Sequence, residues 1–441
     1  MGLKMSRKLP LVVILGSTGT GKTKLSLELA KKFNGEIVGA DSMQIYKELD
    51  IASAKATKEE LASAPHHMVN ILEPHEKFTV LEYRNQVLPI IDDMFSRSKL
   101  PIVVGGTNYY IESILWKLLV DEPGTKVKSE FGKLPNNEHE LPSPVLHEKL
   151  KNLDPVMAKR LHPNNKRKII RSLEVLYQKG ITHSQIIEEQ GGSSKSGGGL
   201  RYDNAIVFWL QCDKDVLDKR LDDRVAKMLE EGLLDELLRF HKLYNEERFK
   251  DKTVDADYSK GIFQSIGFKE FHSYLLLQDD EKNTEQGKKI LNESLKMLKI
   301  ATKRYARKQT KWTISRFLAR KDRQVPPMYG LDTTNVSEWN ENVTKPAFHI
   351  VDSFISRKKC DIEPIPMRED LYSIPNTLEE TYICEVCKKI LVGERQYEVH
   401  MKCRKHKMML AKSKRELKAE LVEESEDMAN KVLSTRTQQR I

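Results

Sequence analysis

A glycine-rich octapeptide near the amino end, flanked by two different hydrophobic patterns, dictates the local fold of this chain. An apolar run at 11–15 precedes it and an amphipathic segment at 24–33 follows it, which predicts a strand, a tight turn and a helix. In such a turn the backbone N–H groups surround phosphate oxygens, the lysine adds a point charge, and the last hydroxyl can ligate Mg²⁺. The predicted phosphate-binding loop consists of Gly16, Ser17, Thr18, Gly19, Thr20, Gly21, Lys22 and Thr23.

Apolar segments alternate with helical patterns through much of the chain, which is typical of a parallel-sheet α/β domain. The predicted strands are 11–15, 36–40, 101–104 and 205–210. The alternation stops after residue 119, where a polar, helix-rich region begins. That region ends in a glycine-serine tract at 191–199, whose composition predicts a flexible connector.

Two cysteines and two histidines near the carboxyl end have the spacing C-x2-C-x12-H-x5-H. Two thiolates on a tight turn and two imidazoles further along can close a tetrahedron around zinc. The predicted ligands are Cys384, Cys387, His400 and His406, and Cys403 is an alternative because the gap before His406 is wide. Basic residues around the second half of this module suit contact with phosphate backbones, although one finger alone specifies little sequence.

These patterns predict an α/β fold, namely a P-loop NTPase-like parallel-sheet core with a helical insertion domain and a C-terminal zinc finger. The predicted parts are the first part of the core at 1–120, the insertion at 121–200, the second part of the core with a basic helix at 201–320, a linker at 321–376, the finger at 377–410 and a charged tail at 411–441.

The 441 residues carry a formal net charge of +10, which favours a polyanionic partner such as nucleic acid. A lysine-rich surface without that role is the alternative. A basic helical pattern at 288–317 places Arg304 and Lys311 near Tyr305 and Trp312, whose rings suit base contacts and core packing equally.

No apolar run approaches the length of a membrane span, so we expect no membrane partner. Five cysteines spread over a long chain indicate a reducing compartment rather than a disulfide framework. We therefore expect a cytoplasmic protein, with mitochondrial and nuclear pools as alternatives.

Polar residues follow two of the predicted strands. Asp41 comes directly after 36–40 and precedes Ser42, Met43 and Gln44. An acid at such a strand end holds magnesium in NTPases, or serves as a general base on a nucleophile in a transferase. The strand at 101–104 leads instead to Gly-Gly-Thr-Asn-Tyr-Tyr at 105–110, which offers the Thr107 hydroxyl and aromatic faces.

With these motifs the sequence resembles the tRNA dimethylallyltransferases, also called tRNA isopentenyltransferases, in particular fungal and animal members with a C-terminal zinc finger. The resemblance covers nearly the whole chain. Its motifs are the phosphate loop, Asp-Ser-Met-Gln-Ile-Tyr at 41–46, His66-His67, the 105–110 motif, Leu-His-Pro-Asn-Asn-Lys-Arg-Lys at 161–168, Arg-Ser-Leu-Glu-Val at 171–175, Arg224-Val225 with Met228 and Gly232-Leu233, and Gln-Ser-Ile-Gly-Phe-Lys-Glu at 264–270. Asn165 stands where many members have Asp, and Lys168 where many have Arg.

The resemblance implies transfer of a dimethylallyl (isopentenyl) group from dimethylallyl diphosphate to the exocyclic amine of the adenosine 3′-adjacent to a tRNA anticodon, position 37, forming N6-isopentenyladenosine. It implies Asp41 as the general base, Thr107 as a group that orients the amine or the base, and Arg224 as a cation beside the leaving diphosphate. The implied cofactors are Mg²⁺ on Thr23 and structural Zn²⁺ in the finger. The implied tRNA-binding residues are Asp41, Ser42, Met43, Gln44, Thr107, Arg167, Lys168, Arg171, Arg304 and Lys311.

The implied partners are the tRNA anticodon stem-loop and dimethylallyl diphosphate, and we expect the enzyme to be a monomer. Two other classes are compatible with the motifs. One is a P-loop nucleotide kinase or ATPase with an RNA-binding zinc finger, and the other is a non-enzymatic RNA-binding zinc protein with a relic phosphate loop.

Overall fold

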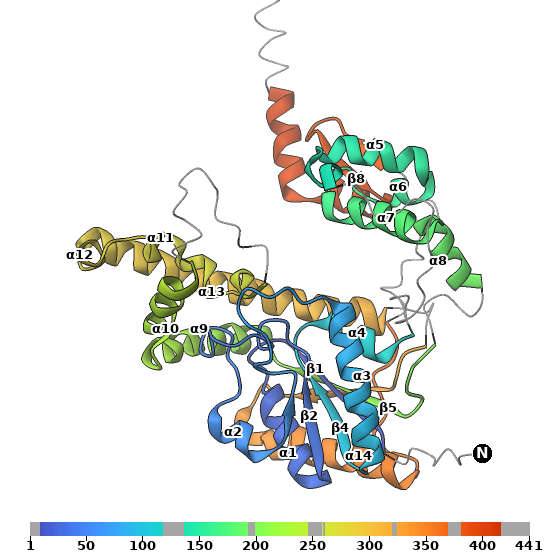
Figure 1. Cartoon of the computed structure of the whole chain (residues 1–441), viewed down its shortest axis with the longest axis vertical. Coiled ribbons are helices and arrows are strands. Elements are labelled where there is room, and N and C mark those ends of the chain that lie inside the picture. The colour runs from blue at the N-terminus through green and yellow to red at the C-terminus, as the bar shows by residue number, and fades with distance from the viewer. Residues whose placement is uncertain are drawn as a thin grey trace, which may run out of the picture. The chain divides into compact units, whose positions relative to one another are not determined.

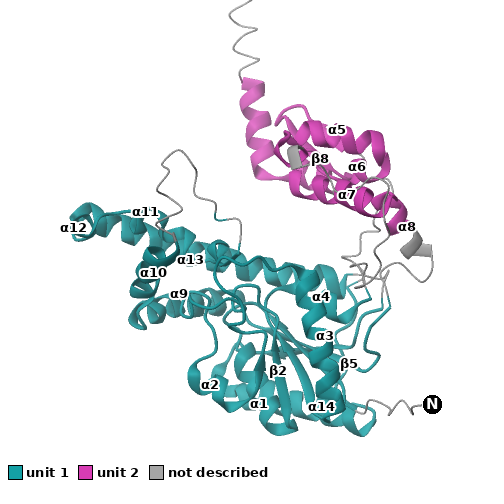
Figure 2. Ribbon diagram, viewed as in Figure 1, with its two compact units in different colours: residues 1–121, 194–372 teal, residues 122–193, 373–441 magenta. Residues whose placement is uncertain are grey.

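The computed structural model describes residues 9–117, 136–192, 199–245, 258, 261–319, 324–368 and 381–415. The chain forms two compact units, the first from 1–121 with 194–372 and the second from 122–193 with 373–441 (Figure 1, Figure 2). Most of the predicted glycine-serine connector and most of the predicted charged tail lie outside the described residues.

A parallel sheet forms the centre of unit 1 (Figure 1). It has six strands in the order β3-β2-β4-β1-β5-β6. The strands are β1 (Leu11–Gly16), β2 (Gly35–Gly39), β3 (His66–His67), β4 (Leu100–Val104), β5 (Ala205–Gln211) and β6 (Met328–Asp332). The predicted α/β class with a parallel sheet is confirmed. All of β1 is buried, which explains its uninterrupted apolar sequence, because helices cover both faces of a parallel sheet.

The described part of the predicted linker at 321–376, residues 324–368, is folded as part of the core, so this part of the predicted domain division is wrong. It contains β6, which pairs in parallel with β5, and α14 (Lys345–Ser356), which buries Ala347, Ile350 and Val351. The polar composition of this segment belongs to the turns between these elements. The apolar residues of β6 and α14 indicate a strand and a helix of the core only when the neighbouring strand and helix are known.

Ten α-helices are described in unit 1. They are α1 (Lys22–Phe33), α2 (Lys58–Ser63), α3 (Val80–Ser96), α4 (Asn108–Leu115), α9 (Lys214–Glu230), α10 (Leu233–Phe240), α11 (His272–Leu275), α12 (Asp279–Lys282), α13 (Glu285–Thr313) and α14. Short 3₁₀ or π turns are η2 (His241–Asn245), η4 (Gly261–Gln264), η5 (Lys269–Phe271), η6 (Ile314–Leu318), η7 (Val336–Glu338) and η8 (Asn340–Thr344).

Alternate residues of β1 belong to two different hydrophobic clusters, because successive side chains of a strand point to opposite faces of the sheet. Val12 and Ile14 join a cluster with residues of α1 and α14. Val13 and Leu15 join a larger cluster with residues of α3, α4 and α13. Each fully buried Val, Leu or Ile side chain contributes about 1.5–3 kcal/mol to folding, so the central strand anchors both layers.

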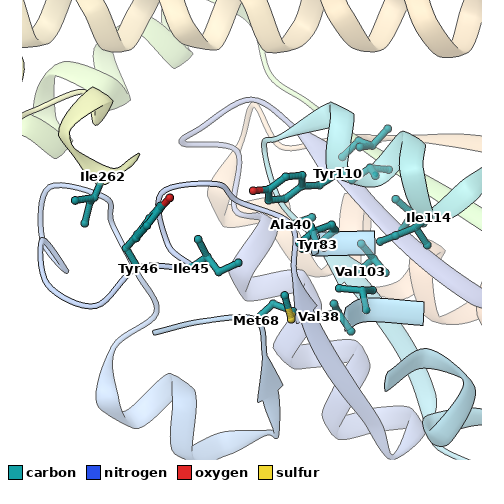
Figure 3. Packing of buried hydrophobic residues seen from close by; sticks show 14 of the residues in the cluster. Val38, Ala40, Ile45, Tyr46, Met68, Tyr83, Val103, Tyr110, Ile114 and Ile262 are labelled. Atoms are coloured by element: carbon teal, nitrogen blue, oxygen red, sulfur yellow. The ribbon is translucent and has the colours of Figure 1, made fainter. Parts of the chain in front are cut away.

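Part of the larger cluster lies directly beneath the carboxyl ends of the strands (Figure 3). There the ring of Tyr83 stacks on that of Tyr110, with centroids 3.9 Å apart. The Tyr83 hydroxyl donates to the carbonyl oxygen of Gly39 at 2.9 Å. These contacts hold the end of β2, which leads into Asp41, against α3 and α4.

Two of the basic residues of α13 form ion pairs with α9. Lys303 contacts Asp222 at 2.6 Å, and Arg307 contacts Asp218 at 2.6 Å. These pairs fasten the basic helix to the core, so part of the positive charge along this segment has a structural role.

Unit 2 combines four helices with a small zinc-finger-like module. Its elements are η1 (Asn136–Glu140), α5 (Ser143–Leu153), α6 (Pro155–Arg160), α7 (Lys166–Lys179), α8 (His183–Gly192), β7 (Thr381–Cys384), β8 (Lys389–Val392) and α15 (Glu394–Lys402), and residues 404–415 are also helical. Leu146, Leu150 and Leu173 belong to its helical core. The Nε2–H of His162 donates to the carbonyl oxygen of Ile390 at 3.1 Å, so the two predicted modules meet in one compact unit.

Candidate active site

The phosphate-binding loop connects β1 to α1 and is held by its own polar groups. The Thr20 hydroxyl and the Lys22 ammonium group both donate to the carbonyl oxygen of Ser17, at 2.8 and 2.9 Å. Gly21 has a φ of +86°, which L residues rarely adopt, and a Cβ there would lie 2.6 Å from the ring of Trp339. The loop conformation therefore needs glycine at this position.

A cavity of about 730 Å³ opens beside this loop, within unit 1. Its size is in the range of pockets that hold small-molecule ligands. The predicted site residues that line it are Thr18, Gly19, Gly21, Lys22, Thr23, Asp41, Ser42, Met43, Gln44, Arg224 and Arg304. Residues more than two hundred positions apart in the sequence thus share one cavity.

Asp41 acts electrostatically on two cations in this cavity. Although part of the Lys22 side chain reaches solvent, burial lowers its pKa to about 8, an effect that Asp41 opposes and Arg224 reinforces. Burial also lowers the pKa of Arg224, and Asp41 again opposes the shift. Arg224 donates to the hydroxyl of Thr18 at 3.2 Å. Two confined cations beside the loop suit a phosphate-bearing anion, since charge is screened weakly in such a site.

Hydrogen bonds orient Asp41 and Thr107 at the other side of the site. One carboxylate oxygen of Asp41 accepts from the N–H of Met43 at 2.9 Å. Thr107 accepts from the N–H of Ser42 at 2.9 Å and donates to the Ser42 hydroxyl at 3.1 Å. The carboxylate and the hydroxyl are therefore held on adjacent loops, which follow β2 and β4.

The remaining loop residues have structural positions. Ser17 and Thr20 are buried, with 4% and 2% of their surfaces exposed. Gly16 ends β1, where a Cβ would lie 2.7 Å from the Thr20 hydroxyl oxygen. These three residues shape the loop without lining the cavity.

The two neighbouring histidines of the 66–67 motif are both hydrogen-bonded. His66 Nδ1 donates to the carbonyl oxygen of Ala64 at 2.8 Å, and His67 Nε2 lies 2.9 Å from a Glu36 oxygen. The hydrogen bond from Arg97 is the main cause that lowers the pKa of Glu36 to about 2. His67 and Arg97 therefore hold an ionised Glu36 on β2, the strand next to the edge strand β3.

Several predicted basic residues lie outside the cavity. Lys311 is exposed on α13 and does not line it. Arg167, Lys168 and Arg171 are exposed on α7 in unit 2, whereas the cavity consists of unit 1 residues. They remain predicted contacts for a polyanion.

Two polar residues of α13 reach the site and were not assigned there from the sequence. Gln309 accepts from the N–H of Thr18 at 2.9 Å, and the Tyr305 hydroxyl lies 3.5 Å from the carbonyl oxygen of Gly106. Their spacing of four residues places both on one helix face. In the sequence this four-residue spacing is difficult to recognise, because basic residues surround Tyr305 and Gln309 in the same helix. Trp312, in contrast, donates to Glu112 at 2.8 Å and contacts the ring of Tyr109, which is 52% exposed.

The four predicted zinc ligands gather in unit 2. The ligand atoms of Cys384, Cys387, His400 and His406 all lie within 4.8 Å of one another. His406 Nδ1 is 3.5 Å from the sulfur of Cys384 and 3.6 Å from that of Cys387. In a tetrahedral zinc site with Zn–S near 2.3 Å and Zn–N near 2.0 Å, sulfur and nitrogen are about 3.5 Å apart.

The remaining ligand gives independent support for a metal. His400 Nε2 is buried and has no hydrogen-bond partner among the described residues, which is costly unless an unseen group satisfies it. Cys403 lies outside the four-residue set, and its sulfur accepts from the N–H of His406 at 3.4 Å. The residues present thus fit a metal ion bound by two thiolates and two imidazoles.

The fold and the cavity define a P-loop α/β protein that can hold a phosphate-bearing ligand beside an oriented carboxylate. Among the described helices, none combines the length and apolar character that a bilayer crossing requires. A family model described as IPP transferase matches residues 44–316, and one described as isopentenyl transferase matches residues 9–69.

Curated relatives and a solved structure agree with these matches. The tRNA dimethylallyltransferase of Homo sapiens is 44% identical over 418 residues, covering 93% of this chain and 88% of the human protein. That of Schizosaccharomyces pombe is 35% identical, covering 92% of this chain and 96% of the yeast protein. A structure described as crystallographic snapshots of a eukaryotic dimethylallyltransferase acting on tRNA is 30% identical, with a TM-score of 0.75 and coverage of 94% of this chain and 100% of that one. The chain belongs to the tRNA dimethylallyltransferase family.

Proposed function

We propose that this protein transfers a dimethylallyl group from dimethylallyl diphosphate to N6 of the adenosine at tRNA position 37, next to the anticodon. The observation that carries the proposal is the single cavity in which Lys22, Arg224 and Asp41 meet at the phosphate loop. A relative of known structure, 30% identical over 94% of this chain, is described as acting on tRNA. Membership of a prenyltransferase family supplies the reaction class.

The donor side of the cavity stabilises a leaving diphosphate. As the bond between the allylic carbon and the diphosphate oxygen breaks, negative charge grows on that oxygen. The loop N–H groups, Lys22 and Arg224 offset this charge, and fixed donors in a confined site do so most effectively. The Thr23 hydroxyl would hold Mg²⁺, which would add positive charge at the same oxygens.

The acceptor side prepares the adenine amine. As the amine nitrogen forms a bond to the allylic carbon, it must lose a proton, and Asp41 accepts that proton as the general base. Thr107 lies beside Ser42 and can orient the amine or the carboxylate. A base paired or stacked in the anticodon loop must leave its stack to reach a site of this kind.

Exposed positive charge and an exposed aromatic ring support an RNA substrate. Arg304 and Lys311 are exposed on α13, and cations of this kind contact phosphates and make binding salt-dependent. Tyr109 is 52% exposed two residues after Thr107, and an accessible ring suits stacking on an unpaired base.

The metal bound by the finger is proposed to be Zn²⁺, because two thiolates and two imidazoles at tetrahedral separations suit zinc. We further propose a monomer in the cytoplasm, with mitochondrial and nuclear pools as alternatives. Size-exclusion chromatography with light scattering and cell fractionation test these two statements.

The decisive experiment incubates purified protein with unmodified tRNA, dimethylallyl diphosphate and Mg²⁺, followed by nucleoside mass spectrometry. The expected product is N6-isopentenyladenosine, located at position 37 by nuclease mapping. Incubation with ATP in place of the prenyl donor is the control. Phosphate release or transfer from ATP, without any prenylated nucleoside, would show a kinase or ATPase instead.

A further inference from the structure

A buried amide joins the two halves of the site. Gln309, which is 5% exposed, extends from α13 between the phosphate loop and the loop after β4. Its Oε1 accepts from the N–H of Thr18 at 2.9 Å, and its Nε2 donates to the carbonyl oxygen of Gly106 at 3.3 Å. One side chain thus links a loop that holds the diphosphate to a loop that holds the acceptor groups.

Both ends of this bridge lead directly to groups of the proposed reaction. On the donor side, the Thr18 hydroxyl accepts from Arg224 at 3.2 Å. On the acceptor side, Gly106 precedes Thr107, which is hydrogen-bonded to Ser42 at 2.9 Å. A shift of the Gln309 amide would therefore change the separation between the diphosphate site and the acceptor site.

The packing around the amide is tight. A Cβ added at Gly106 would lie 2.1 Å from Nε2 of Gln309, far closer than atoms approach in folded proteins. A side chain at position 106 would therefore have to displace the amide of Gln309. The bridge also needs an amide, because it donates at one end and accepts at the other, whereas an ionised glutamate only accepts.

We propose that Gln309 is a positioning residue, which fixes the phosphate loop at the separation from Asp41 and Thr107 that transfer requires. The inference rests on the proposed prenyl transfer. Transfer needs the reacting atoms about 3–3.5 Å apart, and a misplacement of about 1 Å can lower the rate about a hundredfold.

A different role would give a different kinetic result. If Gln309 Oε1 occupied a position that a diphosphate oxygen takes, the donor would have to displace it, and removing the amide would lower KM for dimethylallyl diphosphate. Positioning predicts instead a fall in kcat with little change in that KM, because the donor contacts themselves remain.

The test compares Gln309→Ala and Gln309→Met, of which the second keeps most of the volume and removes both hydrogen bonds. The matched control is Thr313→Val, since Thr313 is 2% exposed one turn further along α13 and its hydroxyl donates to the backbone carbonyl oxygen of Gln309 at 3.1 Å, so the variant removes a hydrogen bond at Gln309 without touching its amide. We expect kcat to fall about tenfold to a hundredfold in both Gln309 variants, with KM for dimethylallyl diphosphate within about threefold of wild type. Thr313→Val should keep the wild-type kcat.

A double variant tests the geometry itself. Gly106→Ala should lower kcat on its own because its methyl group meets the amide, and adding it to Gln309→Ala should lower kcat by less than the product of the two single effects. A wild-type kcat in Gln309→Met, an equal loss in Thr313→Val, or a lower KM in both Gln309 variants would overturn the inference. A wild-type protein that forms no prenylated nucleoside would overturn the proposed function instead.

Discussion

The lowered pKa of Lys22 predicts that the affinity for the prenyl donor falls as the pH rises through 8. A lysine with a pKa of about 8 is about 90% protonated at pH 7 and about 10% protonated at pH 9. A diphosphate binds the charged form, and its terminal phosphate, with a second pKa of about 6, is ionised across this range. Affinity should therefore fall about tenfold between pH 7 and pH 9, or about 1.4 kcal/mol.

Isothermal titration calorimetry with dimethylallyl diphosphate and Mg²⁺, without tRNA, measures this directly. Near pH 8, binding should take up about half a proton, because the bound anion raises the pKa of Lys22 again. Titrations in buffers with different ionisation enthalpies report this uptake. The direction of this pH dependence follows from the lowered pKa of Lys22 in the folded protein. Below about pH 7 the lysine is charged and contributes fully to donor binding, and above pH 8 this contribution is lost.

Lys22→Arg is the matched control. An arginine stays charged throughout this range, so the variant's dissociation constant, whatever its value, should not change between pH 7 and pH 9. An equal dissociation constant at both pH values in the wild-type protein would falsify the reasoning, and so would the same tenfold change in Lys22→Arg.

Three further predictions concern other parts of the site and the finger. Asp41→Ala should lower kcat about 10²–10⁴-fold, the usual contribution of a general base, while tRNA affinity in filter binding stays within several-fold; a large loss of tRNA affinity would mark a recognition role. Arg224→Ala should raise KM for dimethylallyl diphosphate and leave KM for tRNA unchanged in steady-state assays, and the opposite pattern would contradict its place beside Thr18. Cys387→Ser should reduce bound zinc, measured by plasma emission spectrometry, and lower the melting temperature or the tRNA affinity more than kcat; full zinc content would exclude Cys387 as a ligand.

Local patterns in the sequence were sufficient for the central strands, the P-loop and the cluster of two cysteines and two histidines. The apolar run before Gly16 is buried along its whole length, and strand β5 was equally visible because its residues are almost all apolar. The spacing of Cys384, Cys387, His400 and His406 located the cluster, because the two cysteines flank one tight turn and the two histidines are only six residues apart. In these cases the residues that form the sequence pattern and the element that the pattern predicts occupy the same short stretch of the chain.

Other features depend on partners that are distant in the sequence. β6 was missed because its five residues become a strand only by pairing with β5, and β3 consists of two histidines, too few for any periodicity. The ion pair between Lys303 and Asp222 joins α13 to α9, which no pattern within α13 reveals.

The sequence by itself determined that the chain has a P-loop, a parallel-sheet core and a cluster of two cysteines and two histidines that can hold a metal, since backbone propensity, hydrophobic period and residue spacing are local properties. Only the tertiary structure decided that Arg224 reaches Thr18 and that the amide of Gln309 lies between Thr18 and Gly106. Those contacts join elements about two or three hundred residues apart in the chain. They arise because helices α9 and α13 pack at the carboxyl ends of strands, where the loops of a parallel sheet converge.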